Sequence, residues 1–253
     1  MKRVLIIAGC PFGWLDRSAT EVANAIATAH DADDVVVVGA MELATGSWSH
    51  RIIAGEPSPM VRLKNGTPID AEEFGAVLNL VRSLPVTGFA RVNHHDRAYD
   101  EQQSLFVGFL RSFPCRVINS VDAQGPLGRR SPLRWSTLAH RCGIDTSSDG
   151  IRTGTRLLAQ RAMSSSAPTF EATSPTDVTV VGERVFGADS PVHARQCRRL
   201  ARAAGCELLG LQFTSGPHRQ LLAADPFPGL SGHIAHAVAR LLCERAATDE
   251  RVA

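Results

Sequence analysis

Continuous apolar runs and one amphipathic segment open the chain. Residues 4–9 and 35–39 are short apolar runs bounded by glycine or proline, a pattern that predicts two buried parallel strands. The segment between them, residues 16–30, places small or apolar side chains on one helical face, at Ala19, Val22, Ala23, Ile26 and Ala27. Strand, helix and strand make a βαβ unit, for which a right-handed crossover is expected.

Hairpins and further strands follow this unit. Residues 47–59 have an irregular pattern, whereas residues 61–69 alternate around Asn65-Gly66, which is typical of a hairpin. Asp70 begins a short helical turn. The pattern then predicts a strand over 74–79, a helix over 100–113, a strand over 114–119 and a helix over 136–141 that is closed by Gly143.

The C-terminal part is organised around residues 200–230. Glycine and proline divide this stretch into a helix that ends at Gly205, a strand over 207–213, a turn at 215–217, a strand over 219–224 and a break over 225–229. The helix that ends at Gly205 is predicted to begin at Pro191, and a further helix is predicted over 232–245. On spacing alone this is a surface hairpin with a rigid exit loop, although an acidic residue at such a loop also suits a cation.

Together these elements predict an α/β protein. We expect an N-terminal domain with a parallel sheet and a smaller α+β domain after it. The expected boundaries are residues 1–122 for the first domain, 123–245 for the second and 246–253 for a frayed tail.

Composition restricts the partners and the compartment. With 253 residues, of which 44% are hydrophobic, the chain can bury a core in one or two domains. A net charge of +2 does not indicate a nucleic-acid or membrane partner. The six cysteines contain no C-x-x-C pair, and no apolar run approaches the ~20 residues of a membrane helix. We therefore predict a cytoplasmic protein with reduced thiols and no signal peptide.

Two features suggest an enzyme that uses a thiol or a histidine, but nothing else in the sequence supports it. Cys10 lies in a predicted strand-to-helix loop, where the pKa of a thiol can be lowered, but no histidine is placed to pair with it. His94-His95-Asp96 is poorly spaced for a metal site, and an exposed loop or a helix start is the better interpretation.

The order of the elements resembles RimK-type ATP-grasp ligases over residues 1–143 and 176–245. The N-terminal part is similar to the pre-ATP-grasp domain of RimK-type and microviridin-type ligases, and residues 177–188 are similar to a family strand pair. The segments Leu209-Gly210-Leu211-Gln212-Phe213 and Ala223-Ala224-Asp225-Pro226-Phe227-Pro228-Gly229 match the family's closing hairpin in frame. In that family, Glu and Asn of the second strand coordinate Mg²⁺ ions that bridge ATP phosphates.

This resemblance implies a site and also a departure from the family. Ala223 stands at the Glu position, Asp225 at the Asn position and Gln212 where the first strand often carries Asp. Asp225 could still bind a metal, and we expect Arg129, Arg184, Gln212 and Asp225 to border a cleft between the domains. Only residues 144–176 separate Gly143 from Asp177, and residues 145–177 contain no lysine, although family members place an ATP-binding subdomain with lysines and a lid there.

Three function classes remain open at this point. The first is a degenerate ATP-grasp-like protein in a biosynthetic pathway, which binds a small molecule, a peptide or a partner protein and needs no cofactor. The second is a carboxylate-amine ligase that uses ATP and Mg²⁺ to form an amide or peptide bond through an acyl phosphate. The third is an unrelated enzyme that uses a thiol or a histidine. We favour the first class, with no nucleic-acid or membrane partner and with self-association possible.

Overall fold

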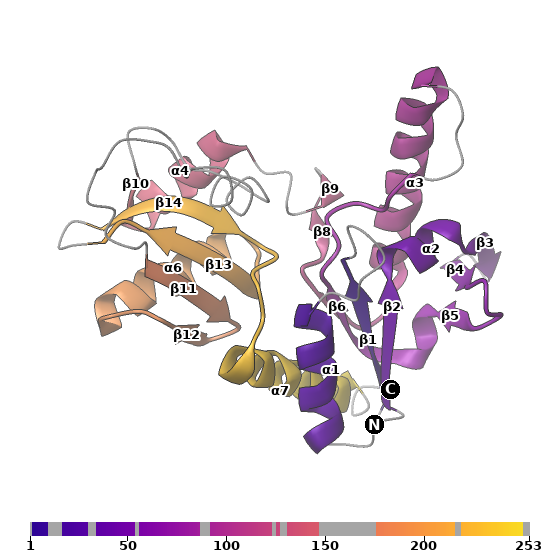
Figure 1. Cartoon of the computed structure of the whole chain (residues 1–253), viewed down its shortest axis with the longest axis horizontal. Coiled ribbons are helices and arrows are strands. Elements are labelled where there is room, and N and C mark those ends of the chain that lie inside the picture. Colours follow the sequence, from indigo (N-terminus) through magenta and orange to yellow (C-terminus); the bar gives the residue numbers. More distant parts are fainter. Residues whose placement is uncertain are drawn as a thin grey trace, which may run out of the picture. The chain divides into compact units, whose positions relative to one another are not determined.

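The chain forms two compact units. The computed structural model describes residues 2–9, 17–29, 34–53, 56–86, 92–122, 125–126, 131–146, 176–215 and 219–249. The first unit combines Met1–Leu127 with Leu230–Ala253, and the second is Gly128–Gly229 (Figure 1). The second unit is therefore an insertion in the sequence of the first.

A parallel sheet forms the centre of the first unit. Its strand order is β2-β1-β6-β7. The strands are β1 (Arg3–Ala8), β2 (Val35–Gly39), β6 (Phe74–Asn79) and β7 (Arg116–Ile118). All of β6 and all but the first residue of β1 are buried, as continuous apolar runs require. With α1 (Arg17–Ala29) between β1 and β2, the βαβ unit and the predicted α/β class are confirmed.

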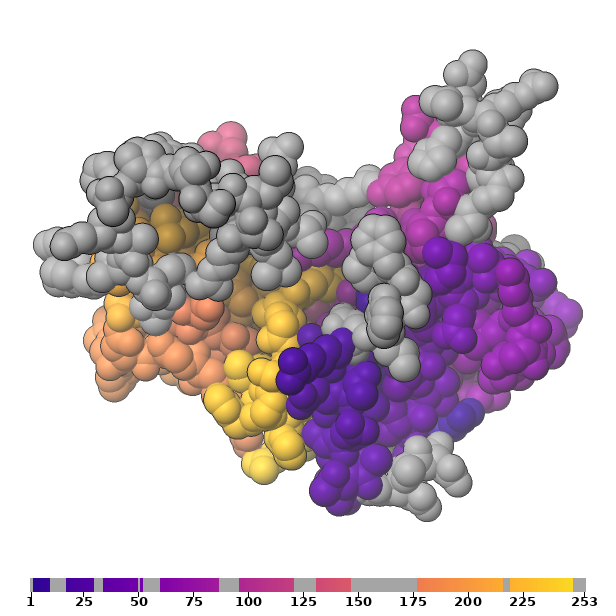
Figure 2. Space-filling view, viewed as in Figure 1, coloured from indigo at the N-terminus to yellow at the C-terminus, as the bar shows by residue number. Residues whose placement is uncertain are grey.

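Helices cover both faces of this sheet. Phe106 and Phe109 of α3 (Val92–Ser112) pack with Leu5 and Val77 in one hydrophobic core. On the other side of the sheet, α1 meets α7 (Gly232–Asp249), and the indigo and yellow surfaces of these helices touch in Figure 2. The start of α3 at Val92 agrees with the prediction that His94-His95-Asp96 lies at a helix start.

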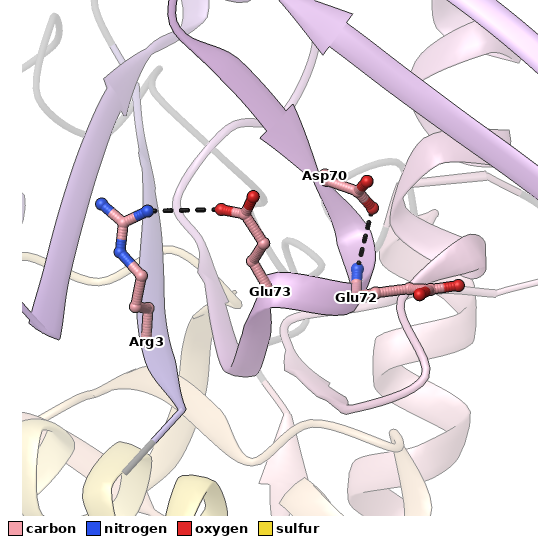
Figure 3. Close-up of polar contacts among 4 residues, drawn as sticks. All are labelled: Arg3, Asp70, Glu72 and Glu73. Carbon is pink, nitrogen blue, oxygen red and sulfur yellow. Dashed lines mark hydrogen bonds and ion pairs between the residues drawn. The ribbon is translucent and has the colours of Figure 1, made fainter.

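A small antiparallel sheet follows α2 (Ala40–Thr45). It contains β3 (Ser47–Ile53), β4 (Glu56–Arg62) and β5 (Pro68–Asp70), so the prediction of irregular structure over residues 47–59 was wrong. The hairpin at Asn65-Gly66 is confirmed, and Gly66 has the φ of +87° that such a turn favours. In Figure 3, Asp70 caps the turn Ala71–Glu73 through the Glu72 N–H at 3.1 Å, and Arg3 pairs with Glu73 at 3.3 Å.

The second unit is built on a mixed five-stranded sheet of order β10-β14-β13-β11-β12. Its elements are α4 (Pro132–Arg141), β10 (Asp145–Thr146), β11 (Thr176–Val181), β12 (Arg184–Phe186), α6 (Pro191–Ala203), β13 (Leu208–Phe213) and β14 (Gln220–Asp225). The short strands β8 (Val121–Asp122) and β9 (Gly125–Pro126) precede it, in the first unit. Helix α4 begins at Pro132, four residues before its predicted start, because Ser131 caps it and proline is preorganised for a first turn.

The C-terminal helix packs in the first unit, whereas the predicted second domain included it. Leu230 N–H donates to Ser18 Oγ at 2.9 Å, and Ala246 is fully buried. A Cβ built on Gly75 of β6 would lie 3.0 Å from Cα of Ala246, so the helix backbone approaches the strand closely. This packing also keeps α7 helical to Asp249, beyond residue 246, where a tail was expected to begin.

No helix in the described parts of the chain has the length and apolar character needed to cross a membrane.

Candidate functional site

Register places the predicted polar residues of β13 and β14 on one side of the second sheet. Asp177 lies opposite Gln212, and Gln212 lies opposite Ala223. Thr179, Gly210 and Asp225 form the next row in the same way. Directly opposed residues of neighbouring strands share a face, so Asp177, Thr179, Gln212 and Asp225 share one surface, which we call the polar face.

The alternating sequence of these strands fixes that arrangement. Val178, Val180, Leu209 and Leu211 occupy the intervening positions and are buried. They therefore point to the side of α6, whose His193 ring meets Phe213 edge-on with centroids 4.6 Å apart. A shift of one residue in register would expose these apolar side chains, so the polar residues are held on the opposite face.

Side chains of the polar face are engaged within the chain. Gln212 donates from Nε2 to Oδ1 of Asp177 at 2.9 Å. Asp225 is half-buried, and its Oδ1 accepts the backbone N–H of Phe227 at 2.8 Å, which turns the chain immediately after β14. The loop then passes over the face, because a Cβ built on Gly210 would lie only 2.8 Å from Cβ of Pro228.

The structure brings together only part of the predicted site. Gln212 and Asp225 lie on neighbouring strands and on the same face. Arg184 is exposed on β12, opposite Val181, and its position is three strands from Asp225, or ~14 Å at the usual strand spacing. Arg129 lies outside the described residues, and the expected cleft between the two domains stays a prediction.

Sequence reasoning did not assign Asp177 to the site. Its pairing with Gln212 depends on the register between β11 and β13, which joins segments far apart in the chain. The only local signal was an acidic residue close to the start of a predicted strand. With Asp177 included, the polar face carries two carboxylates, and one of them already accepts a hydrogen bond from Gln212.

The donor set of the polar face does not fit Mg²⁺ with bridged phosphates. Ala223, the row partner of Gln212, offers only a methyl group. In the described part of the chain, no group of three or more His, Cys, Asp or Glu residues could hold a metal ion. The chain's lysines, Lys2 and Lys64, both belong to the first unit. Within the second unit, permanently charged cations for phosphate oxygens would therefore have to be arginines.

Two arginines of α6, beside this sheet, already bind Glu183. Arg202 contacts Glu183 at 2.5 Å, and this hydrogen bond lowers the pKa of the Glu183 carboxyl. Arg198 donates from Nη1 to the backbone carbonyl of Glu183 at 3.4 Å. Both ion-pair partners are exposed, so the pair contributes little to stability. Its effect is to fix these two side chains at the turn between β11 and β12.

Comparison with known proteins identifies the fold. No family model and no curated protein matches this sequence. Among solved structures, the macrocyclase MdnB from Microcystis aeruginosa MRC is 15% identical, with a TM-score of 0.67 over 95% of this chain and 99% of that one. The macrocyclase MdnC bound with precursor peptide MdnA, from the same source, is 13% identical, with a TM-score of 0.67 over 96% and 99%.

A third similar structure is that of a protein described as an ATP-grasp ligase. The ATP-grasp ligase PsnB, complexed with minimal precursor, Mg and ADP, is 14% identical, with a TM-score of 0.65 over 96% of this chain and 98% of that one. At these identities the likeness shows the fold. The chain therefore has the fold of ATP-grasp ligases, as its resemblance to RimK-type proteins predicted.

Proposed function

Starting from the ATP-grasp fold, we propose that this chain is a peptide-binding protein whose polar face no longer supports ATP-dependent ligation. One observation carries the proposal. Asp177, Gln212 and Ala223 lie in one row of the sheet, where an amide hydrogen-bonded to a carboxylate stands beside a methyl group. That row lacks the cluster of unengaged carboxylates that two Mg²⁺ ions on a nucleotide require.

Energetics support the loss of nucleotide binding. Each charge-assisted hydrogen bond that is missing forfeits roughly 1.5–3 kcal/mol. Since every ~1.4 kcal/mol changes affinity tenfold, two or three such losses move a micromolar site to the millimolar range. Asp225 supplies one carboxylate at the end of β14, and Ala223 supplies none.

A peptide is the ligand class that the comparisons favour. The MdnC structure contains precursor peptide MdnA and a PsnB structure contains precursor peptide PsnA2, and both match this chain over nearly its whole length. A retained frame can keep a peptide-binding surface after the groups that hold nucleotide are lost. The protein would then act in a biosynthetic pathway by holding a peptide for a separate enzyme.

The alternative is an ATP-dependent carboxylate-amine ligase that acts on peptides through an acyl phosphate. It is favoured by the similar PsnB structure, which contains Mg and ADP, and by the position of Asp225 at the end of β14. In that case Asp225 would bind Mg²⁺ while Arg129 and Arg184 neutralised phosphate. Gln212 would act as a neutral hydrogen-bonding group beside them.

Selection from a random-peptide display library, followed by fluorescence anisotropy on the recovered peptides, tests the proposal. We expect at least one peptide to bind the full chain saturably, with the same dissociation constant in the presence and absence of Mg-ATP. Binding that requires Mg-ATP, or turnover of ATP when peptide is added, would support the ligase instead. Failure to enrich any peptide over selection on blank resin would refute the peptide-binding function.

A further inference from the structure

A polar hollow lies on the opposite side of the second sheet from the polar face. Its volume is about 460 Å³, and it sits at the N-terminal end of α6 between β10 and the β13–β14 hairpin. We call it the α6 pocket and define it by six of its lining residues: Asp145, Asp189, His193, Gln196, Phe213 and Arg219. All six belong to the second unit, so the pocket is formed within one compact body.

Three nitrogen atoms at this pocket have unmet hydrogen-bonding capacity. Nδ1 and Nε2 of His193 and Nη1 of Arg219 are buried and have no hydrogen-bond partner in the described structure. An unsatisfied buried polar atom costs roughly 1–3 kcal/mol, so each nitrogen favours any ligand atom that pairs with it. The other edge of the Arg219 guanidinium is taken, because its Nη2 pairs with Asp189.

The His193 ring can turn toward such a ligand. His193 and Arg219 are each half-buried and line the hollow, although the three nitrogens face inward. The His193 ring meets Phe213 only edge-on, and rotation of an imidazole about its second side-chain torsion is broad and nearly two-fold. A modest turn of the ring therefore brings one nitrogen to the cavity, and the unmet hydrogen bond favours that turn.

The charges of the pocket select a dipolar ligand. Arg219 and Asp189 neutralise each other, and Asp145 adds a negative charge at the exposed edge. Burial lowers the pKa of His193, so at neutral pH the ring is uncharged and has one donor and one acceptor. Asp145 and Asp189 would repel an anion, and Arg219 would repel a cation. An amide group avoids both conflicts, because its carbonyl suits a donor and its N–H suits an acceptor.

We propose that the α6 pocket binds a main-chain amide of a peptide ligand, whose carbonyl accepts from Arg219 and whose N–H donates to the His193 ring. Val192, an exposed residue of the pocket lining, supplies apolar surface against which the peptide's Cα and side chain pack. This inference rests on the proposed peptide-binding function and adds to it a location and a mode of recognition. The site is separate from the polar face, which lies on the other side of the same sheet.

Nuclear magnetic resonance on the full chain, with labelled histidine rings and backbone amides, tests the pocket with a defined probe. The probe is N-acetylglycylglycinamide, and acetate and methylammonium at equal concentration serve as charged controls. We expect the His193 ring signals to shift saturably with the amide, at a dissociation constant on the order of millimolar, and several-fold less with either ion.

Matched variants separate a binding role from a structural one. Arg219→Gln should weaken the amide titration at least tenfold, whereas Arg195→Gln, at an exposed position of α6, should leave it unchanged. Should Arg219→Gln fail to fold, His193→Phe keeps the ring packing on Phe213 and removes both nitrogens. The amide signal of Gln196 then reports binding, and the same loss is expected.

The outcomes distinguish the pocket from the wider function. A stronger response to acetate or methylammonium than to the amide would overturn the proposed selectivity. A peptide from display that binds the wild type and the two pocket variants equally would overturn the pocket while leaving the peptide-binding function intact. Absence of any peptide binding to the wild type would instead remove the function on which the pocket rests.

Discussion

Gln212 and Ala223 show how two side chains change the chemistry that a sheet can support. They oppose each other in the ladder, and the resemblance to RimK-type ligases implies that Ala223 stands at a metal-binding Glu position and Gln212 where Asp is often found. An amide lacks the negative charge with which a carboxylate binds Mg²⁺, and a methyl group cannot act as a ligand at all. The Gln212 amide instead donates to Oδ1 of Asp177.

The thiol of Cys197 should react very slowly with alkylating reagents in the folded protein. Burial raises the pKa of its thiol to about 12, so the reactive thiolate is scarce at pH 8. We expect Cys197 to react with iodoacetamide at least a hundredfold more slowly than in urea, as followed by peptide mass spectrometry. Rapid alkylation of Cys197 under native conditions would show that α6 does not bury this side chain against the sheet.

His193 should make the second unit sensitive to acid. Burial lowers the pKa of its ring below the usual 6.5, so the unfolded chain binds the proton first as pH falls. The free energy of unfolding should therefore decrease as pH falls below ~6.5 and level off below the folded-state pKa. Urea denaturation at a series of pH values should show this loss in the wild type and a smaller loss in His193→Phe. Equal slopes for both proteins would assign the acid sensitivity to other groups.

The β13–β14 hairpin and its exit loop act as one element. Asp225 starts the loop through the Phe227 N–H, and Pro228 returns over Gly210. Gly210 is required by this close approach and not by an unusual backbone angle, since no positive φ is found there. The loop therefore depends on the absence of a side chain at one position of the neighbouring strand.

Gly210→Ala should destabilise the protein because the new methyl group overlaps Pro228. Overpacking of this kind costs typically 1–3 kcal/mol, and urea unfolding at pH 7.5 measures it. Gly229→Ala is the matched control, because a Cβ there meets nothing within 4 Å. A Gly210→Ala protein as stable as the control would show that the loop does not rest on β13.

Elements with a strong local pattern were predictable from sequence, and those set by register were not. The apolar runs of β1 and β2 and the Asn65-Gly66 turn identified their own structure. Strands β3 and β4 were missed because Pro57 and Pro59 oppose a strand assignment. Both prolines lie where β4 pairs with β3, beyond the residues that pair with β5.

The candidate site shows the same limit. Its residue types and their order along β13 and β14 were readable from the sequence. Asp177 joined the site only through its pairing with Gln212, a contact between residues 35 positions apart. The α6 pocket was invisible for a similar reason, because Asp189 and Arg219 meet through tertiary packing and not through any local motif.

At the scale of the whole molecule, the first unit needs both ends of the chain. Ending the chain before Gly232 removes the buried side chains Ala235, Val238, Leu242 and Ala246 from α7 and uncovers β6 and α1. Burial of a Val or Leu side chain contributes ~1.5–3 kcal/mol, so the combined loss is comparable with the total stability of a small domain.

Hydrogen exchange measured by mass spectrometry tests that requirement. Peptides from β1 and β6 should lose protection in the chain truncated before Gly232. A chain ending at Asp249 keeps all of α7 and should retain the wild-type protection. Undiminished protection of β1 and β6 without α7 would mean that this helix is not part of the first unit's core.

The chain has the ATP-grasp fold, and we propose that it lacks the groups that hold a nucleotide. Calorimetric titration of Mg-ATP into the full chain tests it most directly. We predict no isotherm in the micromolar range, because the polar face offers Asp177, already bonded to Gln212, and the half-buried Asp225 in place of a full set of metal ligands, and the second unit contains no lysine. A clear micromolar isotherm that is lost in Asp225→Ala would contradict the account and establish a nucleotide site on this face.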